Sequence, residues 1–291
     1  MKKKLSRYSL VTLFSLSLSP LAYADGWSGY VDASLLAGAY SGATTRTAIN
    51  TYGASLRLDY LERAGVKLAG SQLTLTDNGI AIAQQSAFAS AYWNYFCDTL
   101  GGVFKFRLDV HQADLSDDFT YKDSVRAYAP QISFVNYQKS FYVDLGYSIS
   151  TYDLGLEAKQ YTPTLGFGFN QGADWLQMRG YLIDTTDTVS GVVSSTQAVE
   201  FKLTHWTAPG SIFSQYFVNA LVGERILAVD GDAAVIYSLA DKQKGGGAIG
   251  VAWQSHYVDG MLMLSVDQYL DQITSAAYIN SLAYISISKS W

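Results

Sequence analysis

Three histidines and two short acidic segments are the residues of this chain with the clearest potential for chemistry. Nucleophilic hydrolysis needs a histidine placed to take a proton from a serine or cysteine. The histidines are His111, His205 and His256, and the residue two positions after each is alanine, threonine and valine. The sequence holds no Gly-x-Ser-x-Gly segment, the turn that presents a nucleophilic serine in many hydrolases. It therefore offers no recognisable serine-hydrolase site.

A second possible chemistry is hydrolysis by a water molecule that acidic residues and a histidine activate. Asp109 and His111 stand two residues apart, and the segment Asp230-Gly231-Asp232 could place two carboxylates on the other side of a water. The simpler interpretation pairs His111 with Asp109 at the rim of the fold. The acidic residues at 114–118 could hold a hard cation through oxygen ligands, but they lack the spacing of a calcium loop. We therefore predict no enzymatic activity, no metal and no cofactor.

Composition narrows the class of protein that must position these residues. The chain has 291 residues, of which 49% are hydrophobic, 14% aromatic and 15% charged. A disordered protein would carry more charge and fewer aromatic residues. Cys97 is the one cysteine, which excludes a disulfide scaffold. Past the N-terminus no apolar run reaches the roughly 18 residues of a membrane-spanning helix.

The N-terminal residues 1–24 have the features of a secretory signal peptide. Lys2, Lys3, Lys4 and Arg7 precede a mostly apolar stretch at 9–18, and Ala22-Tyr23-Ala24 provides small residues at the cleavage site. Cleavage near Ala24 would remove four of the 20 basic residues and leave 16 against 25 acidic residues, a net charge of −9. Nucleic-acid binding needs a basic surface, so we expect no nucleic-acid partner.

The mature chain, residues 25–291, alternates between apolar and polar residues nearly throughout, as strands with two different faces do. This alternation predicts an all-β chain of fourteen strands, with twelve or sixteen as the alternatives. The predicted strands are 27–42, 49–62, 64–76, 79–95, 101–115, 125–139, 140–153, 160–171, 173–186, 195–208, 211–227, 246–257, 260–272 and 279–291.

The connections between these strands indicate the architecture. With two exceptions, near 77–79 and 95–101, tight turns alternate with longer polar loops, as in transmembrane antiparallel up-and-down β-barrels. The apolar face would contact lipid and the polar face a wet lumen, and the sheet must close because lipid tolerates no open edge. We place Pro130 and Pro163 near the long-loop ends of their strands, where a lost ladder bond costs least.

Aromatic residues gather where strands meet the tight turns and predict an interfacial girdle. They are Trp27, Tyr60, Tyr95, Tyr137, Phe141, Phe169, Tyr257 and Trp291. The last strand also resembles the C-terminal signature of bacterial outer-membrane β-barrels, with apolar Ala283, Ile285 and Ile287 before the terminal aromatic residue, although Lys289 departs from the pattern. This resemblance to the porin-like class, with no subfamily identified, implies integration into the outer-membrane lipid of a Gram-negative bacterium. It also implies that the barrel assembly machinery reads the strand ending at Trp291.

Some outer-membrane barrels are enzymes, and one resemblance bears on this chain. Asp109-Val110-His111 is similar to the Asp-x-His pair of omptin proteases, and Asp230 with Asp232 could supply that family's carboxylate pair, in reversed order along the chain. The outer-membrane phospholipases and lipid A deacylases instead use His-x-Ser, which is absent from this sequence. A rim-located hydrolase is therefore the weakest of the functional hypotheses.

The predicted lumen carries both signs of charge. The candidate pore-lining residues are Arg57, Asp59, Lys105, Arg107, Asp109, His111, Asp144, Arg179, Glu200, Lys202 and Asp267. They would form either a ladder of structural ion pairs or a charged constriction that selects solutes by sign. Small residues at many inward positions, such as Gly146, Gly166 and Gly250, favour an open channel. The loop at 228–246, with apolar residues at 233–239, could fold inward as a gate.

The functional prediction is a passive outer-membrane channel for small polar or charged solutes. The alternative is a barrel that exports or assembles a polysaccharide or protein and works with a secretion-complex partner. A wide lumen with a track of aromatic residues would favour export, whereas a narrow ring of opposed charges would favour the channel.

Overall fold

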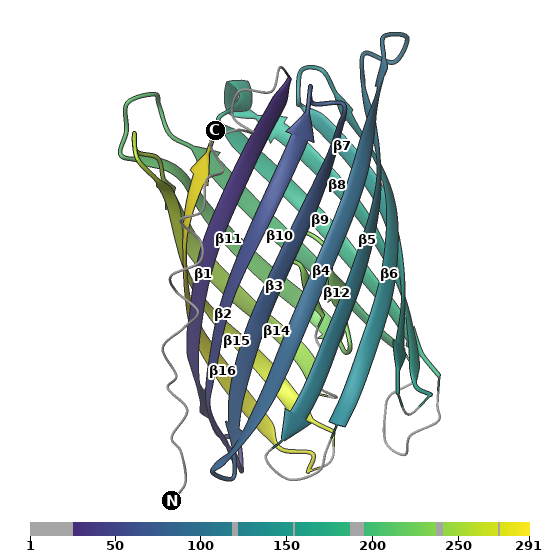
Figure 1. Ribbon diagram of the computed structural model, residues 1–291, viewed down its shortest axis with the longest axis vertical. Helices are drawn as coiled ribbons and strands as arrows, with labels where there is room; N and C mark the ends of the chain where they lie inside the picture. The colour runs from purple at the N-terminus through teal and green to yellow at the C-terminus, as the bar shows by residue number, and fades with distance from the viewer. Residues whose placement is uncertain (1–25, 118–121, 154, 187–194, 237–240, 273) are drawn as a thin grey trace, which may run out of the picture.

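The chain forms a closed antiparallel barrel of fourteen strands, as predicted (Figure 1). The structure is a computed structural model that describes residues 26–117, 122–153, 155–186, 195–236, 241–272 and 274–291. The predicted signal peptide lies outside the described residues. The barrel strands are β1 (Trp27–Ser41), β2 (Arg46–Tyr60), β3 (Ala64–Asp77), β4 (Ile80–Cys97), β5 (Gly102–Asp117), β6 (Lys122–Asn136), β7 (Phe141–Tyr152), β8 (Glu157–Phe169), β9 (Asp174–Thr185), β10 (Ser195–Trp206), β11 (Phe213–Arg225), β14 (Asp241–Trp253), β15 (Asp259–Asp271) and β16 (Ala277–Ser290).

Each barrel strand pairs with its neighbours in sequence, and β1 pairs with β16 to close the ring. Most strand bounds lie within three residues of the predicted ones, but β14 begins five residues earlier, at Asp241. The glycines at 245–247 belong to this strand and pair with β15, so the predicted loop at 228–246 ends before them. A bulge lies between Gln243 and Gly245, and the bare backbone of Gly246 leaves room for the Asp267 carboxylate.

Two prolines occupy positions that differ from the prediction. Pro130 and Pro163 lie in the middle of β6 and β8 and not near the long-loop ends. The β6–β7 ladder lacks pairs between Tyr128 and Gln131, and the β8–β9 ladder lacks pairs between Tyr161 and Thr164. Proline has no N–H to donate, so each interrupts its ladder on one side. The remaining strands of the closed sheet hold the wall together across these gaps.

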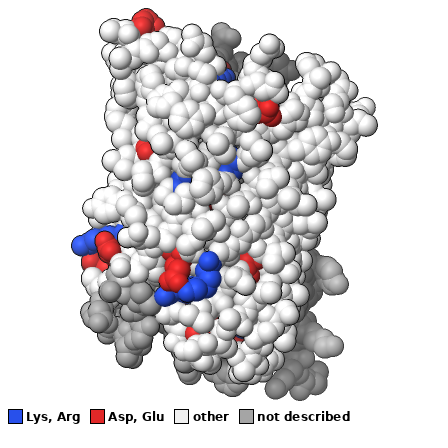
Figure 2. Space-filling view, turned by 180° about the vertical axis from the view of Figure 1, so that it is seen from behind, with Lys and Arg blue, Asp and Glu red and all other residues white. Residues whose placement is uncertain are grey.

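The outer face of the wall is apolar over most of its height. Side chains such as Leu68, Leu108 and Leu145 are exposed, while the residues that alternate with them are shielded inside the ring. Charged side chains gather toward the lower end in Figure 2, the end of the long loops. Lys159 is the register partner of Asp184 in the β8–β9 ladder. Among the described residues, no helix combines the length and apolar character that crossing a membrane would require.

The predicted aromatic girdle lies at the short-turn end of the barrel. Seven of its eight members are exposed there, and Trp27 packs against Tyr60 with ring centroids 5.2 Å apart. The eighth, Trp291, packs its indole over Gly29, where a Cβ would overlap the ring, and exchanges two backbone hydrogen bonds of 3.0 Å with it. The terminal aromatic residue therefore fastens the seam between β1 and β16. The Lys289 ammonium donates to the His256 carbonyl at 3.3 Å, beyond the apolar band.

Candidate functional site: the lumen and its inward hairpin

Strand register shows which candidates share the inner face. Residues opposite one another in an antiparallel pair project to the same side of the sheet. Register pairs connect Lys105 to Ser133, Asp144, Thr164, Arg179 and Glu200 in one continuous row across β5 to β10. The row continues through Leu221 and Gly246 to Asp267. Arg57 and Asp109 belong to a second row, and Asp59 and Arg107 to a third.

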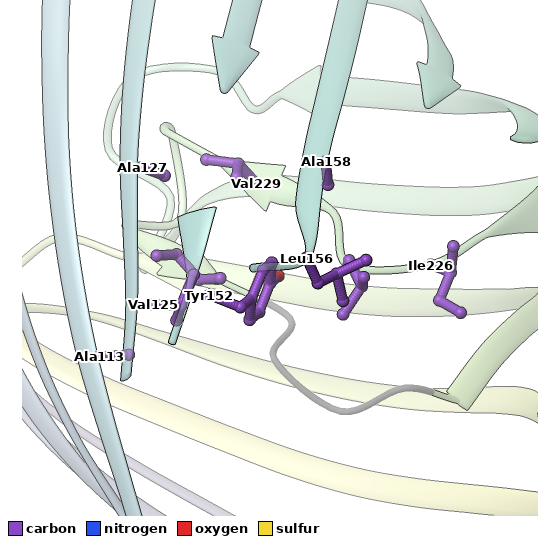
Figure 3. Packing of buried hydrophobic residues seen from close by; sticks show 10 residues of the cluster. Ala113, Val125, Ala127, Tyr152, Leu156, Ala158, Ile226 and Val229 are labelled. Carbon is purple, nitrogen blue, oxygen red and sulfur yellow. The ribbon is translucent and has the colours of Figure 1, made fainter. Parts of the chain in front are cut away.

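The connection between β11 and β14 folds back into the barrel. It contains a short hairpin of β12 (Val229–Asp230) and β13 (Val235–Ile236), which Figure 1 shows within the ring of strands. Ile226, Leu227, Val229 and Ile236 are buried against inner residues of β5 to β8 (Figure 3). Ala228 packs with Tyr181 and Ile183 of β9. The loop thus enters the lumen, as the sequence suggested. Its apolar anchors are Ile226 to Val229, which precede the predicted 233–239 stretch, and Ile236 within that stretch, whose residues 237–239 lie outside the described part of the chain.

Two contacts set the position of the hairpin on the wall. The Gln160 side chain of β8 donates to the Val229 carbonyl at 2.7 Å and accepts from the Val229 N–H at 3.1 Å. At the hairpin turn, a Cβ on Gly231 would overlap the Asp109 carboxylate and lie 2.8 Å from Arg107 Nη2. Glycine is therefore required for this close approach. Asp230 shapes the turn, because its Oδ1 accepts from the N–H groups of Asp232 and Ala233.

The hairpin turn brings the Asp232 carboxylate between two inward-facing arginines, one on β5 and one on β9. Arg107 Nη1 of β5 lies 2.7 Å from Asp232 Oδ1, and Arg179 Nη2 of β9 lies 2.5 Å from Asp232 Oδ2. Each oxygen therefore accepts a charge-assisted hydrogen bond from its own guanidinium, and such bonds are roughly twice as strong as neutral ones. Asp109, which is 1% exposed, lies 3.1 Å from Arg107 Nε, and Asp230 lies 3.8 Å from Arg179 Nη1. We call Arg107, Arg179 and Asp232 the central clasp.

The electrostatics of the central clasp favour an ionised Asp232. Burial in the lumen opposes its charge, but the fields of Arg179 and Arg107 and their hydrogen bonds outweigh this and hold the pKa of Asp232 well below its usual value. Half of the Asp232 side chain, 49%, still faces water, whereas Arg179 is 12% exposed. The contact is therefore an ion pair that is accessible to solvent on the Asp232 side and not a fully buried one.

The remaining sequence candidates fall into separate groups around the lumen. Near the short turns, Arg57 pairs with Asp59 at 2.8 Å and Lys105 lies over the Tyr92 ring, 4.4 Å from its centroid. Tyr142 donates to Asp144 at 2.6 Å. On β10 and β15, Glu200 accepts from Tyr181 and Asn219, Asp267 accepts from Gln243, and Lys202 lies over Phe217. The structure thus brings Arg107, Asp109 and Arg179 together and keeps the other candidates in local networks.

The residues considered for hydrolysis meet in the lumen but make other contacts. Both oxygens of Asp232 bind arginines, and Asp230 shapes the turn of its own hairpin. His111 is buried and packs edge-on against Phe88, with ring centroids 4.6 Å apart. Within the described ranges no hydrogen bond joins His111 to Asp109, so the predicted rim pair does not form. Those ranges also hold no cluster of metal-ligating side chains.

Several residues of the site were not among the sequence candidates. The sequence suggests Asp230 and Asp232 only as a carboxylate pair for hydrolysis, and its local pattern gives no signal for Gln160. Arg225 and Lys67 were also missed, although alternation along their strands places both on the inner face. The small inward residues do not simply leave a void, because Trp175 covers Gly166 and Phe217 covers Gly250. A cavity of about 30 Å³, enough for about two waters, remains between the hairpin, Arg107 and Arg179.

No protein-family model matches this sequence, and no curated protein matches it closely enough to count as a relative. Similar solved structures exist. A mutant of the monoaromatic hydrocarbon channel TodX is 11% identical, with 93% of this chain and 92% of that chain covered at a TM-score of 0.57. A bacterial polysaccharide outer-membrane secretin is 9% identical, with 90% and 98% covered at a TM-score of 0.52. At this identity the likeness concerns the fold alone, and the chain has the fold of a bacterial outer-membrane β-barrel, its subfamily unidentified.

Proposed function

We propose that this protein is a passive outer-membrane channel for small polar or charged solutes. The observation that carries the proposal is the central clasp, which together with Asp109 and Asp230 sets two arginines and three carboxylates around the turn of the inward hairpin. Rings of charged side chains at a constriction select solutes by sign in known pores.

Export of a polysaccharide or protein remains the second hypothesis from the sequence. Its expected feature was a wide lumen with a track of aromatic residues, whereas the described part of the lumen contains an inward hairpin with opposed charges at its turn, which favours the channel. The secretin neighbour shares the fold at 9% identity and does not transfer its cargo to this chain. We also propose that the assembly machinery reads the C-terminal strand, whose last residue joins β16 to β1.

Single-channel conductance of the refolded protein in a planar lipid bilayer tests the channel proposal. We expect stable open steps, and a reversal potential under a salt gradient that reports the sign of the dominant charges. A protein that is heat-modifiable, and therefore folded, but silent at every voltage would overturn the proposal. A preparation of the same protein unfolded before addition to the bilayer is the control for detergent artefacts.

A further inference from the structure

The central clasp has the geometry of a ligand site that is occupied by part of the protein itself. Two guanidinium groups from β5 and β9 each bind a different oxygen of one carboxylate, at 2.7 and 2.5 Å. The strands fix both arginines to the wall, whereas the carboxylate arrives on a hairpin that belongs to a loop. The two arginines, which the strands hold in place, therefore act as the binding site, and the Asp232 carboxylate is the group that can move away from them.

The charge balance shows what would follow if Asp232 left. Within the described chain, both carboxylates in contact with Arg179, Asp230 and Asp232, belong to the hairpin. Arg107 keeps its contact with Asp109 of the wall, and Arg179 keeps a 3.2 Å hydrogen bond to Thr164 Oγ1. The ion-pair contacts left to the two arginines would then include one carboxylate, Asp109, because Glu200, the register neighbour of Arg179 on β10, accepts hydrogen bonds from Tyr181 and Asn219. A largely buried cation without a counter-ion is costly, so hairpin release favours an anion in the vacated place.

The site is also accessible from the lumen. The Asp232 side chain is half exposed, and the small cavity beside Arg107 and Arg179 is lined by polar groups including Gln131, Gln160 and Thr162. Gly231 presents backbone without a side chain at the same place. An incoming solute thus meets hydrogen-bonding groups around the two arginines.

We propose that Arg107 and Arg179 form a binding site for the carboxylate group of a solute, and that Asp232 is an internal occupant which the solute displaces. This inference rests on the channel function proposed above and names its substrate class as organic anions that bear a carboxylate. The internal occupant lowers the apparent affinity of the site, because a solute binds only the fraction of molecules whose clasp is vacant.

Isothermal titration calorimetry of the folded protein in detergent micelles tests the site without requiring conduction. The probe is glucuronate, glucose is its uncharged control, and inorganic phosphate is the control for a general anion site. We expect Asp232→Asn and Asp232→Ala to bind glucuronate at least about tenfold more tightly than the unmodified protein, provided Asp232 fills the site nine-tenths of the time. Adding Arg179→Gln to Asp232→Ala should abolish the gain.

The matched control is Asp153→Asn, which makes the same chemical change in the connection between β7 and β8, outside the lumen, and should bind as the unmodified protein does. Equal glucuronate affinity in the unmodified protein and both Asp232 variants would overturn the inference, as would equally tight binding of glucose or phosphate. Conductance separates the two proposals. A conducting protein whose Asp232 variants gain no affinity refutes the carboxylate site, whereas a silent protein whose variants do gain refutes the channel and leaves the site.

Discussion

The close approach of Gly231 to the barrel wall leads to the most specific prediction. In Gly231→Val the new Cβ would overlap the Asp109 carboxylate and lie 2.8 Å from Arg107 Nη2, where ordinary contact needs about 3.5 Å or more. The backbone of Gly231 is not among the glycines with positive φ, so valine adds no backbone strain of that kind. The hairpin turn must therefore withdraw by about 1 Å, which carries the two clasp hydrogen bonds beyond bonding distance.

The magnitude follows from these two hydrogen bonds. A hydrogen bond to a charged group contributes about 1.5–3 kcal/mol when buried. Asp232 is half exposed, so solvent screening reduces the pair to about 2 kcal/mol in total. Because about 1.4 kcal/mol corresponds to a factor of ten, the equilibrium between the docked and released hairpin should shift about 30-fold toward release.

Single-channel recording at fixed voltage measures this equilibrium as the fraction of time spent in the larger open state. The control is Gly70→Val in β3, where an added Cβ finds its nearest atom, the Ser86 carbonyl oxygen, at 3.7 Å. We expect the control to match the unmodified protein. If Gly231→Val shows the same dwell times and conductance as the control, the hairpin does not gate the lumen through this contact.

Three further predictions concern the same hairpin. Gln160→Leu removes both side-chain hydrogen bonds to Val229 and leaves its buried N–H and carbonyl without these partners, at a cost of about 1–3 kcal/mol each. Hydrogen exchange of the Val229 amide should therefore accelerate at least about tenfold, and unchanged protection would contradict this. Replacing residues 229–236 with a short Gly-Ser linker should raise single-channel conductance, and an unchanged conductance would mean that the hairpin does not narrow the pore. Because the folded-state pKa of Asp232 lies below its unfolded value of about 3.9, its contribution to docking is present above that pH and lost only as the pH falls toward the folded pKa. Gating should therefore stay constant between pH 7 and pH 5, and a transition within that window would implicate another group.

The barrel itself could be predicted because its signal is local. Alternation along a strand assigns each side chain to a face without knowledge of its neighbours, and this is why the candidate residues from Arg57 to Asp267 could be assigned to the polar face. The eight aromatic residues at the short turns and the strand ending at Trp291 followed from the same periodicity and from connection lengths. Proline positions did not, because the cost of a missing ladder bond at Pro130 and Pro163 depends on the rest of the closed sheet.

The central clasp needed the tertiary structure. Asp232 lies 125 residues from Arg107 and 53 residues from Arg179, and nothing in the local pattern couples them. The distance across the lumen depends on the number, tilt and stagger of the strands, which decide whether a loop of given length can reach the opposite wall. The sequence by itself determined a closed barrel with a charged interior and a loop able to enter it. Only the tertiary structure decided that this loop places Gly231 against Asp109 and one carboxylate between two arginines.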